Sequence, residues 1–459
     1  MSQTTRPLMR LAWIVSSAIL ACALLTLYAL KDKILLGAET YVYGYPLVIM
    51  DITRAQSAAH IGPENQLRRV RQFPDASFKD VVRPNVDTLY TTAFLSMKQG
   101  PWIFEMPVQS ERYELMPFMD AWTNVFATPG TRTRKGNESI YLLVGPNWQG
   151  TVPAHMTLFR SPTDMVWLIG RTQTNGVADF ETVHRLQNGL KLYSFKHNQT
   201  AEEPASQEKS KLSAQGLPPV AQMKALSTAA FFEKLFQLMV DNPPATEDAP
   251  LLTRLAHAGL QPGPDVQLSR LDELSFSIGR WLANQKIKNA LSAKNTDGTW
   301  RTPPLNLGQY STDYNTRAVV AMVGLGANLP EDALYPNTAS DEQGQPLNGK
   351  HKYRIHFAAN QLPPVNAFWS LTAYGQDDFL VRNALNRFAL GDRDPLHFNA
   401  DGSLDIWIQD SAPKEPHRMS NWLPIQKDQN FSLNARLYWP KPAALSGTWQ
   451  MPKVVRLED

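Results

Sequence analysis

The chain has 459 residues, of which 43% are hydrophobic and 19% charged, so it is long enough for two or three domains of about 150 residues each. Its 45 basic and 42 acidic residues leave a net charge of only +3, which excludes the strongly basic surface of nucleic-acid-binding proteins. Cys22 is the single cysteine, which excludes disulfides within the chain and thiolate metal clusters.

The N-terminal segment from Leu11 to Leu30 is uncharged and largely apolar, with Arg6 and Arg10 before it and Lys31 and Lys33 after it. At about 1.5 Å per residue, a helix of this length spans a hydrocarbon core of about 30 Å. We therefore predict that residues 1–36 form a tail and a single transmembrane anchor. Long domains after an anchor are translocated largely regardless of flanking charge, so we expect the N-terminus in the cytoplasm and the body outside it.

Two other interpretations of this segment remain open. A cleaved signal peptide is disfavoured because no small-x-small cleavage site closes the apolar run. A lipoprotein signal would end at Cys22, but Leu20 is bulky for that site and apolar residues continue beyond the cysteine. The basic residues on the two sides are equal in number, so the positive-inside rule does not decide the orientation.

Residues 37–178 are predicted to form a β-rich domain. Apolar residues at near-helical spacing first indicate a helix over 38–59, with Pro46 at a kink or in the first turn. From residue 73 to 169, short runs of β-branched and aromatic residues alternate with Gly, Pro, Asn and Asp. Turn signals every 8–12 residues are typical of sandwiches and barrels.

Residues 179–328 are predicted to be a helical connecting section, because the apolar pattern there changes to a period of 3.6. We expect helices over 179–190, 220–240, 246–257, 270–291 and 312–323, and a polar surface connection over 197–218. Strand-like runs return from Tyr353, which makes 329–459 a second β-rich domain. The predicted fold is mainly β, with a helical middle section and two β-sandwich modules of jelly-roll type after the anchor.

Two polar stretches stand out in the first β-rich domain. In Val82–Tyr90, three polar residues in alternate positions would share one face of an extended segment. Carboxylates beside arginine and amide groups are typical of sugar-processing sites, so Asp87 and Asp120 are the candidate catalytic residues. The candidate ligand-binding residues are Arg83, Asn85, Tyr90, Thr123, Asn124 and Arg132. The alternative is that these side chains close turns around proline and satisfy a loop.

The second β-rich domain holds a similar set of polar and aromatic residues. Its candidate ligand-binding residues are Asp392, Arg393, Asn421, Trp422, Arg436 and Tyr438. Turns at the end of a sandwich and a core tryptophan would explain the same residues. The nine histidines show no zinc-binding spacing, and the glycine motifs lack the residues of phosphate and dinucleotide loops, so we expect no resident metal or cofactor.

Several long motifs carry a resemblance to two known families. VRPNVDTLYTTAFL, DAWTNVFATPGTRT, YLLVGPNWQG and VWLIGRTQTNG resemble the domain-of-unknown-function family 1254. DYNTRAVVAMVGLGANLPEDALYPNT, LPPVNAFWSLTAYG, GDRDPLHFNADGSLDIWIQD and NWLPIQKDQNFSLNARLYWPKP resemble the companion family 1214. The resemblance covers roughly residues 40 to 455. It implies a bacterial, exported or membrane-anchored protein with two sandwich-like modules, and it implies no established reaction.

Two functions from different classes follow as expectations. In the first, the protein is an enzyme of the bacterial inner membrane, with its body in the periplasm, that acts on a polar polymer such as a glycan. Asp87 or Asp120 would then be the acid or base. In the second, it is a non-catalytic binding or scaffold module of the cell envelope. The expected partners are the inner membrane through residues 11–30, a polar ligand such as a glycan, and a second copy of the chain, but no nucleic acid.

Overall fold

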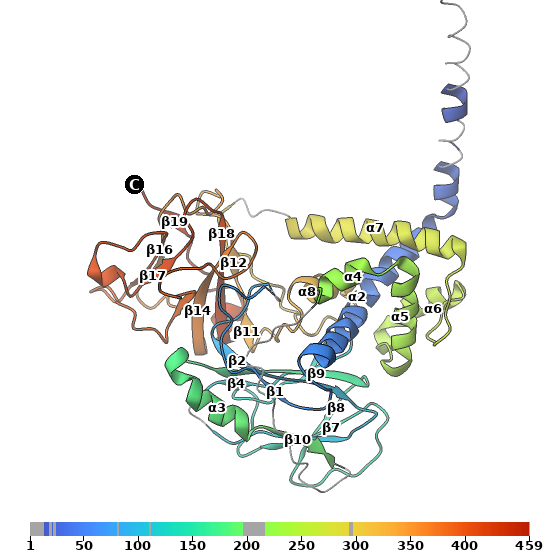
Figure 1. Cartoon of the computed structure of the whole chain (residues 1–459), viewed down its shortest axis with the longest axis horizontal. Coiled ribbons are helices and arrows are strands. Elements are labelled where there is room, and N and C mark those ends of the chain that lie inside the picture. Colours follow the sequence, from blue (N-terminus) through green and yellow to red (C-terminus); the bar gives the residue numbers. More distant parts are fainter. Residues whose placement is uncertain are drawn as a thin grey trace, which may run out of the picture.

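The computed structural model describes residues 13–17, 21, 24–79, 82–109, 112–195, 216–292 and 297–458. Three parts are visible in Figure 1. A β module from the first half of the chain lies at the bottom, a second β module from the C-terminal residues lies at the left, and a helical part lies at the right.

The N-terminal β module is a pair of packed sheets. Its larger sheet has the order β1-β2-β9-β5-β6, with β4 also paired to β9, and its smaller sheet has the order β10-β3-β7-β8. The strands are β1 (Arg68–Arg69), β2 (Thr88–Ser96), β3 (Trp102–Glu105), β4 (Glu114–Leu115), β5 (Phe118–Asp120), β6 (Val125–Ala127), β7 (Ile140–Val144), β8 (Thr157–Arg160), β9 (Met165–Gln173) and β10 (Lys191–Ser194). Helix α3 (Phe180–Gly189) leads into β10.

Alternation along the strands explains this packing. In β2, Ala93 and Leu95 point into the core between the sheets, where they join Phe104, Phe118 and Leu168. The intervening residues of β2 point to the opposite face of the larger sheet, which the rest of the molecule covers in part. One face of this sheet therefore closes the sandwich, and the other is free to meet the helices and the second β module.

The C-terminal β module repeats the arrangement with other strands. One sheet has the order β11-β18-β14-β15, with β12 also paired to β18, and the other has the order β17-β16-β13-β19. The elements are β11 (Ala333–Leu334), β12 (Asn337–Thr338), β13 (Tyr353–Phe357), β14 (Val365–Gly375), β15 (Ala389–Gly391), β16 (Leu404–Gln409), β17 (Trp422–Pro424), β18 (Phe431–Pro440), α9 (Pro442–Leu445) and β19 (Val455–Arg456). A core that includes Tyr353, Ile406 and Leu437 fills the space between the sheets.

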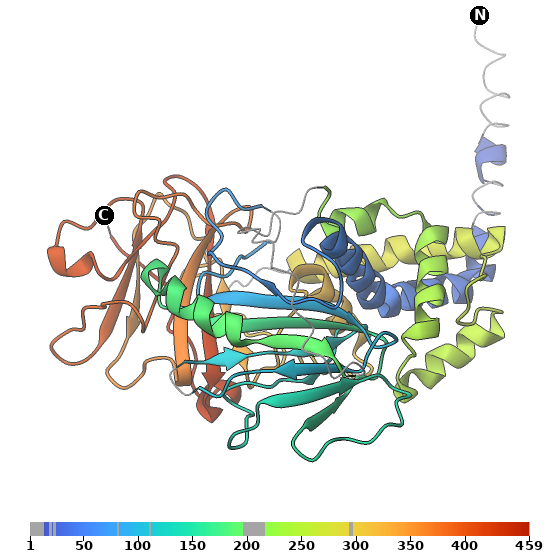
Figure 2. The same cartoon turned by 60° about the horizontal axis from the view of Figure 1, so that its bottom comes forward.

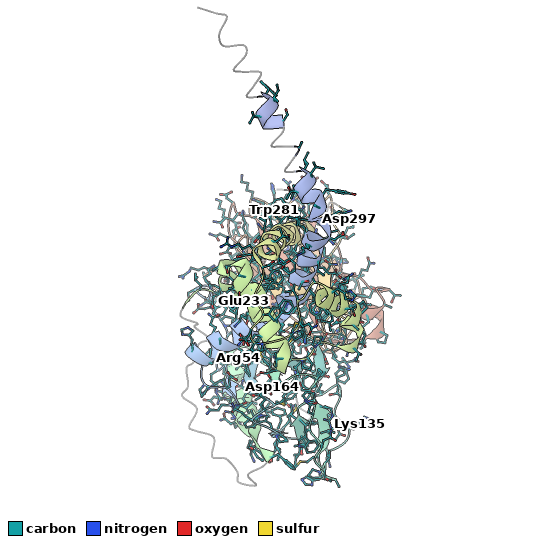
Figure 3. The ribbon with its side chains drawn as sticks, turned by 90° about the vertical axis from the view of Figure 1, so that its right-hand side faces the viewer. Arg54, Lys135, Asp164, Glu233, Trp281 and Asp297 are labelled. Atoms are coloured by element: carbon teal, nitrogen blue, oxygen red, sulfur yellow. The ribbon has the colours of Figure 1, made fainter. Side chains whose placement is uncertain are left out.

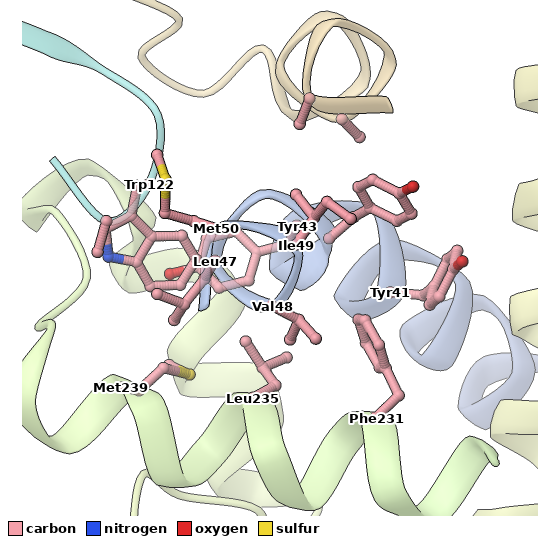
Figure 4. Packing of buried hydrophobic residues seen from close by; sticks show 14 of the residues in the cluster. Tyr41, Tyr43, Leu47, Val48, Ile49, Met50, Trp122, Phe231, Leu235 and Met239 are labelled. Carbon is pink, nitrogen blue, oxygen red and sulfur yellow. The ribbon is translucent and has the colours of Figure 1, made fainter. Parts of the chain in front are cut away.

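The helical part is built around α2 (Lys31–His60), which contacts each of its main helices. These are α4 (Pro219–Ala225), α5 (Thr228–Asp241), α6 (Ala249–His257), α7 (Arg270–Ser292) and α8 (Tyr314–Val323). Figure 4 shows Val48 of α2 facing Leu235 of α5, with Tyr43 beside Trp122 of the first β module. One apolar cluster thus joins the helices to the other face of the larger sheet. Figure 2 shows the helices beside this sheet from a second side.

The predicted pair of β modules with a helical middle section is confirmed, but the fold is mixed α and β rather than mainly β. Helix α2 continues through Pro46 and packs with the middle helices, although it precedes the first strand in the chain. The single helix predicted over 220–240 is wrong. It divides at Leu226 because Ser227 adopts an extended conformation and caps α5, accepting a hydrogen bond from the Ala230 amide at 3.1 Å.

The predicted anchor over 11–30 falls partly outside the described residues. Within the described part of the chain, no helix is both long enough and apolar enough to span a bilayer. The apolar side chains that are described before α2, including Trp13, Leu25 and Tyr28, are largely exposed. The predicted anchor and the predicted domain boundaries stay predictions.

Candidate functional site

The first polar stretch lies at the joint between the two β modules. Asp87, at 1% exposure, accepts a hydrogen bond from the Ser370 hydroxyl at 2.6 Å and forms an ion pair with Arg393. Arg393 also donates to the backbone oxygens of Asp87 and Thr174 at 3.0 and 2.9 Å, and its guanidinium lies 4.1 Å from the centre of the Phe368 ring. The carboxylate of Asp87 is thus held by side chains of the second module.

Asn85 fixes the turn that leads into β2. Its side-chain oxygen accepts hydrogen bonds from the backbone amides of Asp87 and Thr88 at 2.6 and 3.2 Å. Its amide nitrogen donates to the hydroxyl of Tyr438 in the second module at 3.0 Å and to the hydroxyl of Tyr90 at 3.3 Å. The residue closes a local turn and links the modules at the same time.

Arg83 and Arg436 complete this joint from opposite sides. Arg83, in a left-handed conformation with φ of 50°, forms an ion pair with Asp378 at 3.0 Å. Buried Arg436 donates to the backbone oxygen of Arg83 at 3.1 Å and to the Tyr374 hydroxyl at 2.6 Å. Six predicted residues from the two clusters are therefore components of one polar joint, namely Arg83, Asn85, Asp87, Arg393, Arg436 and Tyr438.

Arg132 forms a second tie between the modules. Its guanidinium makes a bidentate ion pair with Asp332 at 2.6 and 3.0 Å, and the Asp332 side chain has no solvent exposure. Bidentate arginine–carboxylate pairs combine charge with fixed geometry. This predicted residue is therefore committed to the contact between the modules.

The other predicted residues of the second module do not converge on the joint in the same way. Exposed Asp392 accepts a hydrogen bond from the Trp369 amide at 3.2 Å. Asn421 donates to the backbone oxygens of His397 and Asp405, and the Trp422 indole donates to the Gln409 oxygen at 2.9 Å. Asn421 and Trp422 thus stabilise loops and strands within their own module, which is the alternative interpretation of these residues.

Asp120 lies far from Asp87 along the same sheet. Asp120 is opposite Val166 on β9. Asp87 lies at the other end of β9, where its backbone oxygen accepts a hydrogen bond from the Thr174 amide just beyond the strand. Eight residues of extended chain at about 3.3 Å each separate these positions by roughly 25 Å. Paired carboxylates of glycosidases are about 5–9.5 Å apart. The two candidate catalytic residues cannot act together on one bond.

Asp120 belongs instead to a loop that meets the helical part. Its carboxylate accepts hydrogen bonds from the Trp122 and Asn124 amides at 2.9 and 2.8 Å, and Asn124 adds its side-chain nitrogen at 3.2 Å. Burial raises the pKa of Asp120 to about 6, and these bonds and the nearby charge of Arg317 limit the rise. Thr123, with φ of 70°, completes the loop.

Arg317 of α8 is a buried cation at the same contact. Its guanidinium carbon lies 5.2–5.4 Å from the ring centres of Tyr43, Trp122 and Tyr314. Its Nε and Nη2 atoms are buried and meet no acceptor among the described residues. Both tyrosines donate to Asp248, at 3.1 and 2.8 Å. The carboxylates of Asp120 and Asp248 therefore offset the charge of Arg317, and the rings give it a cation–π environment.

Tyr90 of the joint is half-buried. It lies opposite Arg171 on β9, with the guanidinium 5.2 Å from the centre of its ring. Tyr335 of the second module is also half-buried and lies close enough for the charges of Arg171 and Tyr90 to influence the pKa of its phenol, which burial raises. The two phenols lie at the joint between the modules, and we call this part of the joint the seam.

The hydroxyl groups of Tyr90 and Tyr335 each accept a hydrogen bond, and the O–H of each is an unused donor. Tyr90 accepts from the Asn85 amide at 3.3 Å, and Tyr335 accepts from the Asn328 amide at 2.6 Å. Among the residues that the structure describes, neither hydroxyl has an acceptor for its own hydrogen. Arg171 donates to neutral acceptors, namely the Asn328 side chain, the backbone oxygens of Ile169 and Gly326, and the Tyr90 phenol. The seam therefore presents hydrogen-bond donors.

The same face of β2 continues from Tyr90 to a surface hollow. Half-buried Thr92 follows, and then Phe94, which stacks on Trp167 at 5.2 Å between ring centres. The hollow beside Thr92 and Phe94 is lined by the end of α2 and by residues 62–68. There the Nε of Arg68 is buried and meets no acceptor in the described part of the chain. We use the name β2 groove for the strip from Tyr335 and Tyr90 through Thr92 and Trp167 to Arg68, of which only the end at Thr92, Phe94 and Arg68 lines the hollow.

The structure gives no sign of a metal centre in the part that it describes. No group of three or more His, Cys, Asp or Glu side chains in the described ranges is placed to hold an ion. The chemistry available in the β2 groove is hydrogen-bond donation and aromatic contact, and at the hollow the carboxylate of Glu64, which pairs with Arg54.

Comparison with known families agrees with the two modules. Residues 64–194 match the family described as a protein of unknown function (DUF1254), and residues 332–442 match a second family of unknown function (DUF1214). The chain carries a DUF1254 domain followed by a DUF1214 domain. No curated protein is similar enough in sequence to be matched.

A solved structure shares the architecture. The crystal structure of the VPA0106 protein from Vibrio parahaemolyticus is 22% identical, with a TM-score of 0.69, and the match covers 93% of this chain and all of that one. An uncharacterized protein from Burkholderia cenocepacia matches at 11% identity and a TM-score of 0.46, over 97% of this chain and 98% of the other. The Vibrio structure shows that the fold extends through the helical part.

The polar joint is the contact between the DUF1254 and DUF1214 domains, because each of its partners lies in one of the two matched ranges. Sequence reasoning found Tyr90 but missed Arg171, Tyr335 and Arg68. Tyr90 and Arg171 are 81 residues apart and become neighbours through the β2–β9 register. Arg68 was visible only as part of the basic run Arg68–Arg71.

Proposed function

We propose that this protein is a membrane-anchored protein of the cell envelope that binds a polar, oxygen-rich ligand such as a glycan in the β2 groove, without catalysing a reaction on it. The observation that carries the proposal is the pair of half-buried phenols, Tyr90 and Tyr335, whose hydroxyl protons have no acceptor among the described residues. A ligand with hydroxyl or carboxylate oxygens would satisfy these donors.

The other groups along the groove suit the same class of ligand. Trp167 offers part of an aromatic ring, and Arg68 offers an unused N–H. Burial, followed by repulsion from Arg69, lowers the pKa of Arg68, so an acidic group would relieve its unfavourable environment. Acidic sugars are therefore favoured over neutral ones.

The binding function is preferred over catalysis because the candidate carboxylates are already engaged. Asp87 is held by Arg393 and Ser370, and Asp120 is held by its own loop. Their separation of roughly 25 Å along the strand also disfavours two-carboxylate glycoside hydrolysis.

The binding test uses full-length protein and two oligosaccharide probes of equal length, one of uronic acids and one of neutral glucose units. Calorimetry should detect the uronic acid probe. Tyr90→Phe and Tyr335→Phe each remove one hydrogen-bond donor and should weaken binding about three- to tenfold each. Tyr193→Phe is the matched control, because this half-buried tyrosine lies on β10 and bonds with Glu105. Equal affinity of all three variants, or no binding of either probe, would contradict the proposal.

The proposed location rests on the apolar segment 11–30. The exposed apolar side chains described there, among them Trp13, Leu24 and Leu25, support insertion into a bilayer because water is an unfavourable surrounding for them. Carbonate extraction of membranes, combined with protease treatment of spheroplasts, tests the location. Release by carbonate or protection of the body from protease would contradict it.

A further inference from the structure

Helix α7 carries apolar side chains on two opposite sides. Phe276, Ala283 and Ile287 are buried against the rest of the helical part. On the other side, Leu274 is 53% exposed and Trp281 is 60% exposed. A surface helix of a soluble protein usually has one apolar face, which packs on the core. A second, exposed apolar face indicates a contact with a membrane or another molecule.

The outer side chains form one continuous stripe. Leu271, Leu274, Ile278 and Trp281 or Leu282 follow the spacing of three to four residues that places side chains on the same face of a helix. The exposed basic residues that flank the stripe are Arg270, Lys286 and Lys288. An apolar stripe bordered by basic residues and containing tryptophan is typical of helices that lie in the interface of a bilayer.

The contact between α7 and α2 sets the distance of this stripe from the predicted anchor. Gly279 brings the α7 backbone so close to α2 that an added Cβ would lie 2.4 Å from the Ile34 oxygen and 2.6 Å from the Ala38 nitrogen. The Lys33–Asp272 ion pair at 2.6 Å adds to this contact. Ile34 to Ala38 follow Leu30, the last residue of the predicted anchor, by four to eight residues. At about 1.5 Å per residue, the crossing lies roughly 10 Å from the end of the anchor.

The figures place Trp281 on the side of the body from which the described residues before α2 extend. In Figure 1, α7 lies across the N-terminal part of α2, and the described residues before α2 extend away from the body beyond it. Figure 3 shows Trp281 at this end of the body and Glu233 of α5 farther from it. A membrane crossed by residues 11–30 would therefore meet α7 from the side of Trp281.

We propose that the outer face of α7 lies in the interfacial layer of the bilayer, with Leu271, Leu274, Trp281 and Leu282 among the lipid headgroups and upper acyl chains. This inference rests on the membrane anchor of the proposed function and adds a second, independent contact with lipid. Arg270, Lys286 and Lys288, together with Lys31, favour anionic phospholipids. The contact would hold the body close to the membrane in one orientation, instead of leaving it to swing on a single helix.

The test places a fluorescent label at single cysteines of the full chain, reconstituted in vesicles of phosphatidylethanolamine and phosphatidylglycerol. A Cys22→Ser protein carries Leu274→Cys on the outer face of α7 or Glu233→Cys as an exposed helical control. The protein without substitutions is labelled at Cys22, and this label reports whether the predicted anchor is in lipid. Quenchers attached to lipid at headgroup depth should reduce emission of the label at 274 at least about twofold and leave the label at 233 unchanged.

Each alternative result has a definite meaning. A label at 274 that stays in water while the label at Cys22 is quenched by lipid overturns the α7 contact and leaves the anchor in place. A label at 274 that is shielded from both water and lipid also overturns it, because another protein surface then covers the helix. Quenching at 274 without quenching at Cys22 supports the α7 contact and contradicts the anchor. Labels that stay in water at both 274 and Cys22 contradict both the α7 contact and the anchor.

Discussion

At the scale of single residues, the polar motifs of the two families serve mainly to satisfy one another. Both carboxylate oxygens of Asp87 are engaged within the protein, one by Arg393 and the other by Ser370. Buried charges are tolerated only when they are paired. This requirement explains why Asp87 of the first module pairs with Arg393 of the second, and Arg132 of the first with Asp332 of the second. The residues that remain open to a ligand are those whose polar atoms are incompletely used, such as Tyr90 and Tyr335.

Asp120 makes the stability of the protein depend on pH. Burial raises its folded-state pKa to about 6, above the ordinary value of 3.8. Its contribution to stability is therefore fully present below about pH 4 and is lost as the pH rises through 6. A difference of about two in pKa corresponds to roughly 3 kcal/mol.

Urea unfolding of the wild type and Asp120→Asn at pH 4, 5, 6 and 7 checks this expectation. The free energy of unfolding of the wild type should fall relative to that of the variant between pH 4 and 6. A difference between the two proteins that is the same at every pH would show that Asp120 has an ordinary pKa.

At the scale of elements, the crossing of α2 and α7 decides how the helical part is built. Phe276 contacts the position where Gly37 lacks a side chain, and Gly279 lies against the α2 backbone. Two glycines within helices cost conformational entropy, which is offset by the closer approach of the two backbones. This contact makes α2 part of the helical section, although the β-rich segment separates the two along the chain.

Gly279→Ala tests that crossing. Alanine is the better helix former by roughly 1 kcal/mol, but its Cβ would clash with the Ile34 oxygen and the Ala38 nitrogen. We expect a net destabilisation of about 1–3 kcal/mol in urea unfolding, as for other overpacked contacts. Gly263→Ala is the control, because an added Cβ there meets nothing closer than 3.7 Å. A stabilised Gly279→Ala protein would mean that the helices are not in such close contact.

At the scale of the whole molecule, the two β modules are held together by buried charge pairs at their joint. Arg393 reaches across to Asp87, and Arg132 reaches across to Asp332. The seam that holds the proposed ligand therefore has a fixed width, set by these pairs rather than by a linker.

Asp87→Asn should destabilise the protein by about 3–5 kcal/mol, because it leaves Arg393 buried without its charge partner. Asp377→Asn removes the exposed Lys79–Asp377 pair, whose side chains are 51% and 59% exposed, and should cost less than about 1 kcal/mol. Urea denaturation of both variants measures the two effects. A similar small loss for both would show that the joint does not depend on the buried pair.

Much of the fold followed from the sequence because it depends on local patterns. Alternating and 3.6-residue periods predicted the two β-rich regions and the helical middle section, and the long motifs by themselves indicated both families. Those signals are short-range, since each depends on a few neighbouring residues. Ser227, which divides one predicted helix into two, is a local capping signal that is present in the sequence and was overlooked.

Only the tertiary structure decided which polar residues meet. Asp87 and Arg393 are 306 residues apart, and the register of β2, β9 and β5 separates Asp87 from Asp120 although the two are close in sequence. A single sequence carries residue types and spacing but no pairing between distant segments. It therefore determined that the chain has two β modules and a set of clustered polar residues in each. Packing determined that most of these residues form a structural joint and that Tyr90, Tyr335 and the outer face of α7 stay partly exposed.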